Sequence, residues 1–212
     1  MGLTAGHTTV RIGLTGGIGS GKTTAAAILQ QFGAQVLDAD AVARSLGAPG
    51  GAAVPGVLAA FGSAMLTADG ALDRAALRER VFADPAARHL LESLLHPLIA
   101  AALEAQAAVS AASTLVFDIP LLAESRHWRA RVDRILVIDC ETSTQLERVC
   151  RRPGWSEATS RHAIAAQAPR AARRSIADAV VYNDGVSLEQ LQAALQAVWR
   201  AWHHQPPNPV EQ

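Results

Sequence analysis

The chain contains a single lysine, Lys22, and it lies in the glycine-rich segment Gly16-Gly17-Ile18-Gly19-Ser20-Gly21-Lys22-Thr23. All other residues in the combined lysine and arginine count of 19 are arginine. The segment matches the pattern GxxxxGK[ST], in which backbone N–H groups surround phosphate oxygens and a lysine ammonium completes the site. Arginine is a poor substitute there, because its guanidinium is planar and broader than an ammonium. The sequence therefore predicts a phosphate-binding loop at residues 16–23.

The residues around this loop have the context that the pattern requires. The apolar run Val10–Thr15 predicts a buried strand, and a helical pattern begins at Lys22. The alternative is a glycine-rich turn without a ligand, which leaves the glycine spacing and the sole lysine unexplained. We expect Lys22 to bridge the β- and γ-phosphates of ATP and the Thr23 hydroxyl to bind Mg²⁺. The residues expected to bind the nucleotide are Gly17, Ile18, Gly19, Ser20, Gly21, Lys22, Thr23 and Thr24.

Further strands are predicted at four short segments, Gln35–Asp38, Thr114–Phe117, Arg134–Ile138 and Ala179–Tyr182. They alternate with helical stretches, which favours a parallel, doubly wound sheet. The predicted fold is therefore α/β, of the P-loop NTPase class, with a five-stranded parallel sheet flanked by helices. Ligands of such sheets bind beyond the carboxyl ends of the strands.

Two long insertions interrupt this pattern. Our prediction is one domain over 8–204, with a core at 8–45, 113–141 and 178–204, a helical insertion at about 46–112, a helical lid at about 142–177 and a disordered tail at 205–212. Within the first insertion, a helix is predicted at Arg74–Phe82, capped by Asp73, and a second at Leu90–Ala108. Pro97 disfavours helical backbone at His96, which predicts a bend at that point.

The second insertion is rich in arginine. Most arginine runs are solvated helix faces, and we interpret most of these residues in that way. Arg148 and Arg152 are the exceptions. They are four residues apart, a spacing that places both on one helix face just after a core strand. We expect them to neutralise charge on the transferred phosphoryl group from a mobile lid.

Three acidic residues close predicted strands. Asp40 follows the strand beside the loop, where it either accepts a proton from an acceptor hydroxyl or caps the next helix. Asp118 either occupies the position of a metal-binding acid or shapes the turn into Ile119-Pro120. Asp38 either reaches Mg²⁺ through water or only ends its strand.

Composition excludes several partners. The formal net charge is zero, so no basic field favours nucleic acid. No apolar run approaches the ~20 residues that span a bilayer, so no membrane association is expected. The two cysteines form neither a disulfide framework nor a paired metal-ligand spacing, which favours reduced thiols and a cytoplasmic location. No pattern indicates an oligomeric state.

Over residues 10–200, the chain resembles the dephospho-coenzyme A kinase family. The resemblance rests on an ordered set of segments: residues 14–23, Asp38-Ala39-Asp40 with Ala43-Arg44, Leu77–Phe82, Leu95-His96-Pro97, Pro120–Glu124, Gln167, Arg170, Arg173, Ala177-Asp178 and Asn183-Asp184-Gly185. It implies ATP-dependent phosphorylation of the ribose 3'-hydroxyl of dephospho-CoA, the last step of coenzyme A synthesis. It also implies that the helical insertion at about 46–112 is acceptor-binding. A departure from the family pattern is Pro153-Gly154-Trp155 in the lid.

The resemblance also assigns residues to the two substrates. It implies that Asp40 is the candidate base and that Arg148 and Arg152 reach the ATP phosphates. It assigns Arg44, Arg78 and His96 to the acceptor side and Asn183 to the loop that holds adenine. From the residues alone, His96 is either a helix-end residue bonded to backbone or a hydrogen-bond donor to the acceptor.

Three other classes compete with this interpretation. Another P-loop small-molecule or nucleotide kinase retains the loop but lacks the combined Leu-His-Pro and Pro-Leu-Leu-Ala-Glu segments. A guanine-nucleotide switch needs Asn-Lys-x-Asp, which a chain with one lysine at position 22 does not have. A transport ATPase usually carries a Leu-Ser-Gly-Gly signature, which is absent from the sequence.

Overall fold

The structure is a computed structural model that describes residues 9–204. The predicted tail at 205–212, Thr8 and the residues before it lie outside the described residues. The chain divides into two compact units. The first comprises the described residues up to Leu37 and those from Ala111 onward, and the second comprises Asp38–Ser110. Each unit is built around its own apolar cluster.

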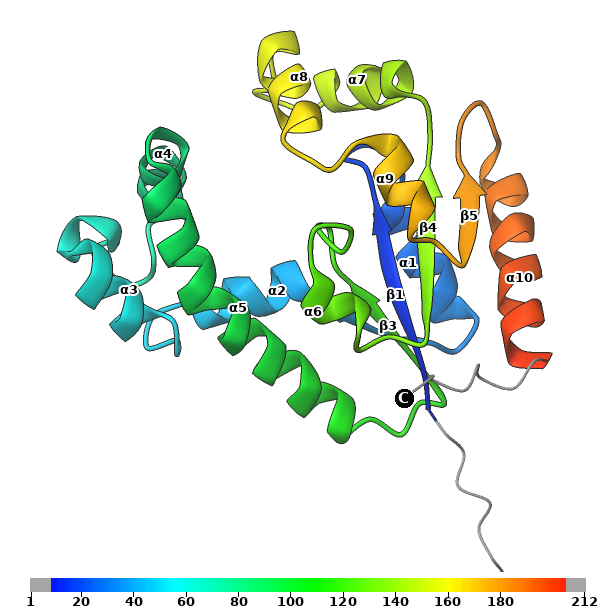
Figure 1. The fold of residues 1–212 in the computed structure, drawn as a ribbon, viewed down its shortest axis with the longest axis horizontal. Coiled ribbons are helices and arrows are strands. Elements are labelled where there is room, and N and C mark those ends of the chain that lie inside the picture. Colours follow the sequence, from blue (N-terminus) through cyan, green and yellow to red (C-terminus); the bar gives the residue numbers. More distant parts are fainter. Residues whose placement is uncertain (1–8, 205–212) are drawn as a thin grey trace, which may run out of the picture. The chain divides into compact units, whose positions relative to one another are not determined.

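The first unit is organised around a five-stranded sheet with the strand order β2-β3-β1-β4-β5. Figure 1 labels four of these strands, β1, β3, β4 and β5. The strands are β1 (Val10–Gly16), β2 (Gln35–Asp38), β3 (Thr114–Asp118), β4 (Arg134–Asp139) and β5 (Ala179–Tyr182). β1 pairs in parallel with β3 and β4, and β4 pairs in parallel with β5. All five segments predicted as strands are confirmed, because each is a short apolar run that ends at glycine or a polar residue.

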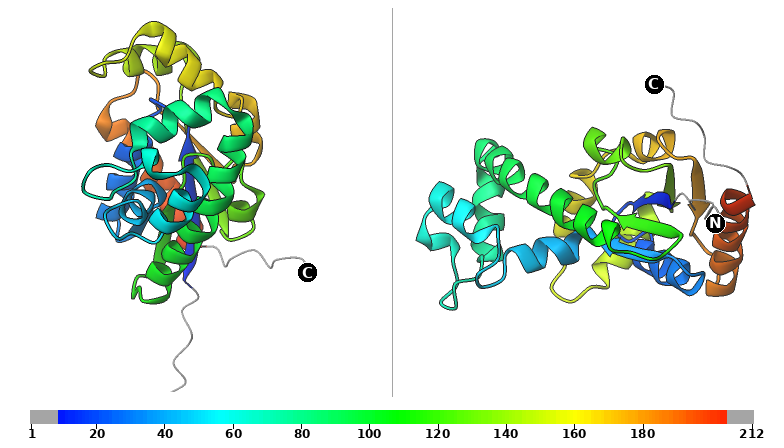
Figure 2. Two further views of the ribbon diagram at one scale, coloured as in Figure 1. Left: turned by 90° about the vertical axis from the view of Figure 1, so that its left-hand side faces the viewer. Right: turned by 90° about the horizontal axis from the view of Figure 1, so that it is seen from below.

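Helices cover both faces of this sheet. α1 (Lys22–Gln31) and α10 (Leu188–His204) contact each other and share an apolar cluster with the strands, which includes Leu14, Leu29 and Leu195. On the opposite face lie α6 (Arg126–Arg129) and α9 (Arg170–Ser175), as two further views show (Figure 2). α7 (Thr142–Cys150) and α8 (Glu157–Ala165) lie in the segment predicted as the lid, which also includes α9.

The second unit is helical. It contains α2 (Ala39–Leu46), α3 (Val54–Phe61), the short 3-10 helix η1 (Ser63–Met65), α4 (Arg74–Ala83) and α5 (Pro85–Ala108). Its buried core consists of Ala53, Val57, Leu72 and Leu77. α5 contacts α2, α3 and α4, so these four helices surround a single small core.

The helices of the second unit agree with the sequence at α4 and differ at α5. Asp73 caps α4 by accepting hydrogen bonds from Ala75 N and Ala76 N at 2.9 and 3.0 Å, as predicted. The predicted interruption at His96-Pro97 is wrong, because α5 continues through Pro97. The lost backbone hydrogen bond is offset by packing of α5 against its neighbours. Of the described helices, none is both long and apolar enough to cross a bilayer.

Candidate functional site

The phosphate loop connects the end of β1 to the start of α1. Ser20 N donates to Gly17 O at 2.9 Å, which closes a turn, and Gly19 has a φ of +80° that favours glycine. Gly21, with a φ of +94°, is the residue before α1. The first turn of α1 contains no acidic residue, so the positive end of the helix dipole is free to attract an anion. Local backbone geometry therefore supports the predicted anion site.

The only lysine lies at the start of α1 and is paired with an acid from β3. Lys22 Nζ forms an ion pair and a hydrogen bond with Asp118 Oδ1. The two side chains are 17% and 9% exposed, so most of the pair is shielded from water. Asp118 thus lies beside the phosphate loop, as the metal-binding interpretation requires. Thr23 is the next residue of α1, and it is exposed.

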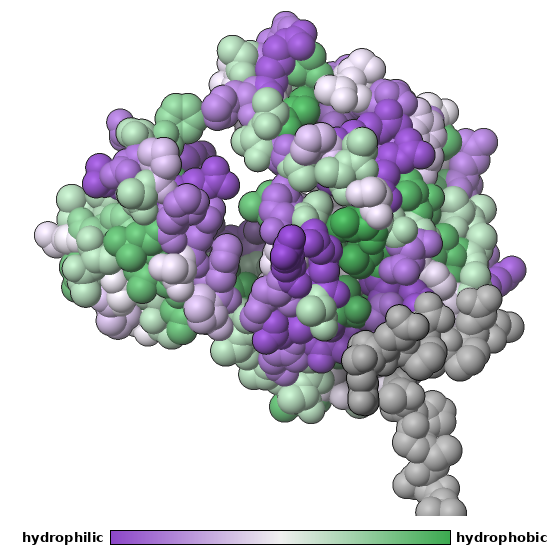
Figure 3. Space-filling model, in the orientation of Figure 1, coloured by the Kyte–Doolittle hydropathy of each residue, from purple (hydrophilic) through white to green (hydrophobic). Residues whose placement is uncertain are grey.

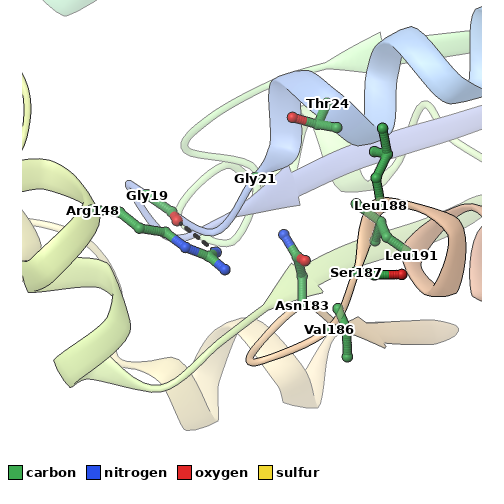
Figure 4. A pocket seen from close by; sticks show the side chains of 9 residues that line it. All are labelled: Gly19, Gly21, Thr24, Arg148, Asn183, Val186, Ser187, Leu188 and Leu191. Carbon is green, nitrogen blue, oxygen red and sulfur yellow. Dashed lines mark hydrogen bonds between the residues drawn. The ribbon is translucent and has the colours of Figure 1, made fainter.

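A small cavity opens beside the loop. Its volume is about 310 Å³, and its lining comprises Gly19, Gly21, Thr24, Arg148, Asn183, Val186, Ser187, Leu188 and Leu191. Figure 4 shows Arg148 and Asn183 reaching toward the loop from separate elements. Arg148 Nη1 donates to Gly19 O at 3.2 Å, and Asn183 Nδ2 donates to Ser20 O at 2.7 Å. A Cβ atom at Gly21 would lie 2.2 Å from Asn183 Nδ2, so this approach requires glycine.

The apolar part of this cavity was not predicted. Val186, Leu188 and Leu191 belong to the loop after β5 and to α10, and they supply a surface on which a flat ring can lie. The only feature of the sequence that could have marked them as site residues is their position directly after Asn183-Asp184-Gly185. The cavity brings Asn183 and Arg148 together with three loop or helix residues expected to bind nucleotide, Gly19, Gly21 and Thr24.

Two lid arginines predicted to share a helix face do not share one. α7 ends at Cys150, so Arg148 lies in its last turn and Arg152 lies in the turn beyond it. The Arg152 guanidinium is above the Trp155 ring at 5.8 Å and is exposed. The helix therefore ends two residues before Arg152, and Pro153-Gly154 follows. Hydrophilic side chains are prominent over α7 and α8 in the space-filling view (Figure 3).

Other arginines of the lid were interpreted as solvated, and two of them are not. Arg170 donates from Nη2 and Nε to Asp139, at 2.8 and 3.0 Å, and Asp139 is 2% exposed. Arg173 is 5% exposed and donates to the Ala168 carbonyl. Burial lowers the pKa of Arg173, whereas the bonds to Asp139 and Glu141 raise that of Arg170. Arg151, paired with exposed Glu147, fits the solvated interpretation.

Acidic groups around Arg170 are also perturbed. The hydrogen bond from Arg170 lowers the pKa of Glu141. The Glu141 backbone N–H and the Thr144 hydroxyl lower the pKa of Asp184. Burial raises the pKa of the Cys140 thiol to about 11, so this cysteine is neutral near pH 7. The end of β4 therefore carries a network of arginine and carboxylate groups.

Two glutamines that were not predicted as site residues bind the phosphate loop. The Ile18 N–H donates to Gln167 Oε1 at 2.7 Å, and Gln145 Nε2 donates to the Ile18 carbonyl at 2.8 Å. Ile18 was expected to offer its N–H to phosphate, and here that N–H is bonded to a side chain. Gln167 was noted only in the family resemblance, and Gln145 carried no signal in the sequence.

The acceptor-side residues all lie in the second unit. Asp40 is in the first turn of α2 and Arg44 in its last turn, while Arg78 is in α4 and His96 in α5. All four side chains are exposed, which leaves them accessible to a ligand. The helix-end interpretation of His96 is wrong, because the residue lies in the interior of α5.

Asp38, and not Asp40, caps α2. Asp38 Oδ1 accepts a hydrogen bond from Ala41 N at 2.9 Å, and its other oxygen lies 3.6 Å from Arg44 Nη2. The interpretation of Asp40 as a helix cap is therefore wrong. This leaves the carboxylate of Asp40 without a capping task.

The described residues contain no group of three or more His, Cys, Asp or Glu side chains that would hold a metal by themselves. Oxygen donors are nevertheless present at the loop, as the Thr23 hydroxyl and the Asp118 carboxylate. This set fits an ion such as Mg²⁺, which takes one or two protein oxygens and completes its shell with phosphates and water.

Comparison with known proteins identifies the family. Residues 10–189 match the family model described as "Dephospho-CoA kinase". The chain belongs to the dephospho-CoA kinase family. A Dephospho-CoA kinase of Bordetella parapertussis is 51% identical over 193 residues, which are 91% of this chain and 90% of the relative. A Dephospho-CoA kinase of Burkholderia pseudomallei is 45% identical over 187 residues, 88% of this chain and 92% of the relative.

Solved structures agree with a dephospho-CoA kinase fold. The crystal structure of TT1252 from Thermus thermophilus superposes with a TM-score of 0.78 at 35% identity, covering 91% of this chain and 97% of that one. A Dephospho-CoA kinase from Campylobacter jejuni superposes with a TM-score of 0.66 at 22% identity, covering 92% and 98%. At that identity the second likeness shows the fold alone. The resemblance inferred from the sequence is confirmed.

Proposed function

We propose that this chain transfers the γ-phosphoryl group of ATP to the ribose 3'-hydroxyl of dephospho-CoA, giving coenzyme A and ADP. The observation that supports this most strongly is the extent of the family match. Residues 10–189 include the phosphate loop, Asp40, Arg44, Arg78, His96, both lid arginines and Asn183. We also propose a cytoplasmic location, supported by two free thiols, Cys140 and Cys150.

The donor side of the reaction is supported by the geometry of the phosphate loop. The ammonium of Lys22 contacts the terminal phosphates, and backbone N–H groups of the loop and of α1 hold their oxygens. The adenine ring lies in the cavity between Asn183 and the apolar residues after β5. Arg148 and Arg152 neutralise negative charge that develops on the transferred group.

Mg²⁺ accompanies the nucleotide in this proposal. The Thr23 hydroxyl and the Asp118 carboxylate are the groups that would hold it. When bound, the ion neutralises charge on the phosphate oxygens.

On the acceptor side, Asp40 orients the 3'-hydroxyl and accepts its proton. The hydroxyl oxygen forms a bond to the γ-phosphorus while the bond between that phosphorus and the β,γ-bridging oxygen breaks, and ADP leaves. Arg44, Arg78 and His96 bind the acceptor through its phosphates and ribose. Their exposure in the helical unit supports this assignment.

A coupled ADP-release assay with ATP and Mg²⁺ tests the proposal. The acceptor panel contains dephospho-CoA, AMP, CMP and shikimate. Of these four acceptors, we expect only dephospho-CoA to give rapid, saturable turnover. Turnover with another acceptor at a higher kcat/KM would support the alternative, a different small-molecule or nucleotide kinase on the same core.

A further inference from the structure

The glutamine clamp, Gln145 together with Gln167, binds both polar groups of a single loop residue. Gln167 Oε1 accepts from the Ile18 N–H at 2.7 Å, and Gln145 Nε2 donates to the Ile18 carbonyl at 2.8 Å. Gln145 is on α7 and is 1% exposed, whereas Gln167 lies between α8 and α9. Because the Gln145 amide is buried, movement of the loop away from it would leave a buried donor unsatisfied, which is energetically unfavourable.

The clamp acts on the centre of a turn. The bond from Ser20 N to Gly17 O makes Ile18 and Gly19 the central residues, and the φ of +80° at Gly19 is typical of a type II turn. Glycine tolerates either sign of φ, so the peptide between Ile18 and Gly19 is intrinsically able to flip. In a planar trans peptide, the carbonyl and the N–H point in opposite directions. A carbonyl fixed on Gln145 therefore directs the Gly19 N–H away from Gln145.

Packing leaves little room for the clamp to move. A Cβ atom at Gly17 would lie 2.0 Å from Gln145 Nε2 and 2.7 Å from Arg173 Nη2. A Cβ atom at Gly19 would lie 3.0 Å from the Gln145 carbonyl oxygen. α7 is thus in direct contact with the loop. Arg148, three residues after Gln145, reaches Gly19 O from the same helix.

We propose that Gln145 and Gln167 are positioning residues, which hold the two peptide groups on either side of Ile18 in the orientation that binds the donor phosphates and fix the segment bearing Arg148 against the loop. Neither glutamine contacts the reacting atoms. Both act through the loop backbone. The expected effects on kinetics rest on the proposed function, whereas the expected effects on the loop structure rest on the loop geometry alone.

The direction of each hydrogen bond allows a test that distinguishes hydrogen bonding by the two glutamines from simple packing. Glutamate at position 167 retains an acceptor for the Ile18 N–H, whereas glutamate at position 145 replaces a donor with an acceptor facing a carbonyl. Both substitutions add one negative charge beside a backbone group of Ile18, so their difference reports mainly on bond direction. We expect Gln167→Glu to have a kcat/KM for ATP at least about fivefold higher than that of Gln145→Glu, the scale of one hydrogen bond.

Methionine variants separate hydrogen bonding from volume. Gln145→Met and Gln167→Met keep the length of the side chain, and each is expected to lower kcat/KM for ATP about tenfold, the effect of losing one well-formed bond. Gln196→Met, on the exposed face of α10, is the matched control and should retain parent kinetics. Parent-like kinetics in both clamp variants, with folding intact by circular dichroism, would overturn the proposal.

Amide hydrogen exchange of the ligand-free protein provides a readout that needs no turnover. Gln167→Met should accelerate exchange at Ile18, and Gln167→Glu should not. Unchanged protection at Ile18 in Gln167→Met would overturn the proposal even in an active enzyme. A parent chain that shows protected Ile18 but no turnover of dephospho-CoA would instead overturn the proposed function and leave the positioning of the loop established.

Discussion

The ammonium of Lys22 and the carboxylate of Asp118, 96 residues apart in the chain, form an ion pair at the carboxyl end of the sheet. Both side chains are largely shielded from water. An incoming nucleotide therefore competes with Asp118 for the lysine. Exchange of one anionic partner for another keeps the ammonium neutralised at each stage.

Lys22→Ala is expected to lower kcat/KM by at least about 10²-fold, the loss typical of removing a preorganised group that stabilises transition-state charge. The coupled ADP-release assay measures the effect. Asp118→Asn also breaks the ion pair and retains the lysine, so its thermal melt is the control for any loss of stability in Lys22→Ala. Near-normal turnover of folded Lys22→Ala would contradict the donor site as proposed.

Asp40→Asn is expected to lower kcat by about 10² to 10⁴-fold with little change in ATP affinity, because it removes a general base. Its thermal stability should match the parent, since Asp38 provides the cap of α2. Asp38→Ala is the contrasting variant and should lose about 1 kcal/mol of stability. Steady-state kinetics, ATP calorimetry and thermal melts distinguish these outcomes, and an equal loss of kcat and ATP affinity in Asp40→Asn would argue against a base.

Arg148 and Arg152 should differ in their kinetic signatures. Arg148 already contacts Gly19 O, so Arg148→Ala is expected to weaken ATP binding as well as turnover. Arg152 lies beyond the end of α7, and we expect Arg152→Ala to lower kcat by about 10² to 10³-fold with ATP affinity retained. Calorimetry with ATP and kinetics with both substrates test this. A variant of Arg152 that is only mildly slower would favour a surface function for that residue.

Arg170→Leu should destabilise the fold. It removes the two-atom contact to Asp139, which is 2% exposed. Loss of one partner of a buried pair costs about 3–5 kcal/mol, and we expect the low end because Arg174 Nη1 lies 3.7 Å from the same carboxylate. For a chain of this size, the melting temperature should fall by about 10 °C. Arg151→Leu, which breaks the exposed pair with Glu147, is the control and should change it by no more than about 2 °C. Equal melting temperatures of the two variants would show that Asp139 does not depend on Arg170.

Acid should destabilise the chain partly through Glu141 and Asp184. Their pKa values are lowered in the folded state from ordinary values of 4.5 and 3.8. The unfolded chain therefore takes up these protons at a higher pH than the folded chain. The stabilisation is complete above about pH 4.5 and is lost as pH falls through the lowered values. Glu141→Gln combined with Asp184→Asn should melt with a shallower dependence on pH between 5 and 3, and parallel curves would exclude this contribution.

The strands and the phosphate loop were predictable because each is specified by local sequence. An apolar run that stops at Gly16 or Asp118 limits a strand whatever surrounds it. α5 was mispredicted because Pro97 was given more weight than packing. The true start of α5 could have been predicted from the sequence. Asp84 is a good N-cap residue, and Pro85 follows it at the first helical position, where proline is favoured.

The contacts of the lid were beyond sequence reasoning for a different reason. A glutamine that binds a backbone carbonyl 127 residues away has no local pattern, as Gln145 shows. Similarly, no local pattern predicts that Arg173 is buried and Arg151 exposed. Only the tertiary fold decides which polar side chains of a helix face the loop and which face water.

The position of β1 in the sheet has a consequence for biogenesis. β1 precedes both of its neighbours in the chain, which begin only at Thr114 and Arg134. During synthesis, β1, the strand that leads into the anion-binding turn, therefore has no hydrogen-bonding partner in this sheet until more than half of the polypeptide has been made. Such long-range pairing slows folding, whereas the helical unit at Asp38–Ser110 is complete by then and free to fold first on the ribosome.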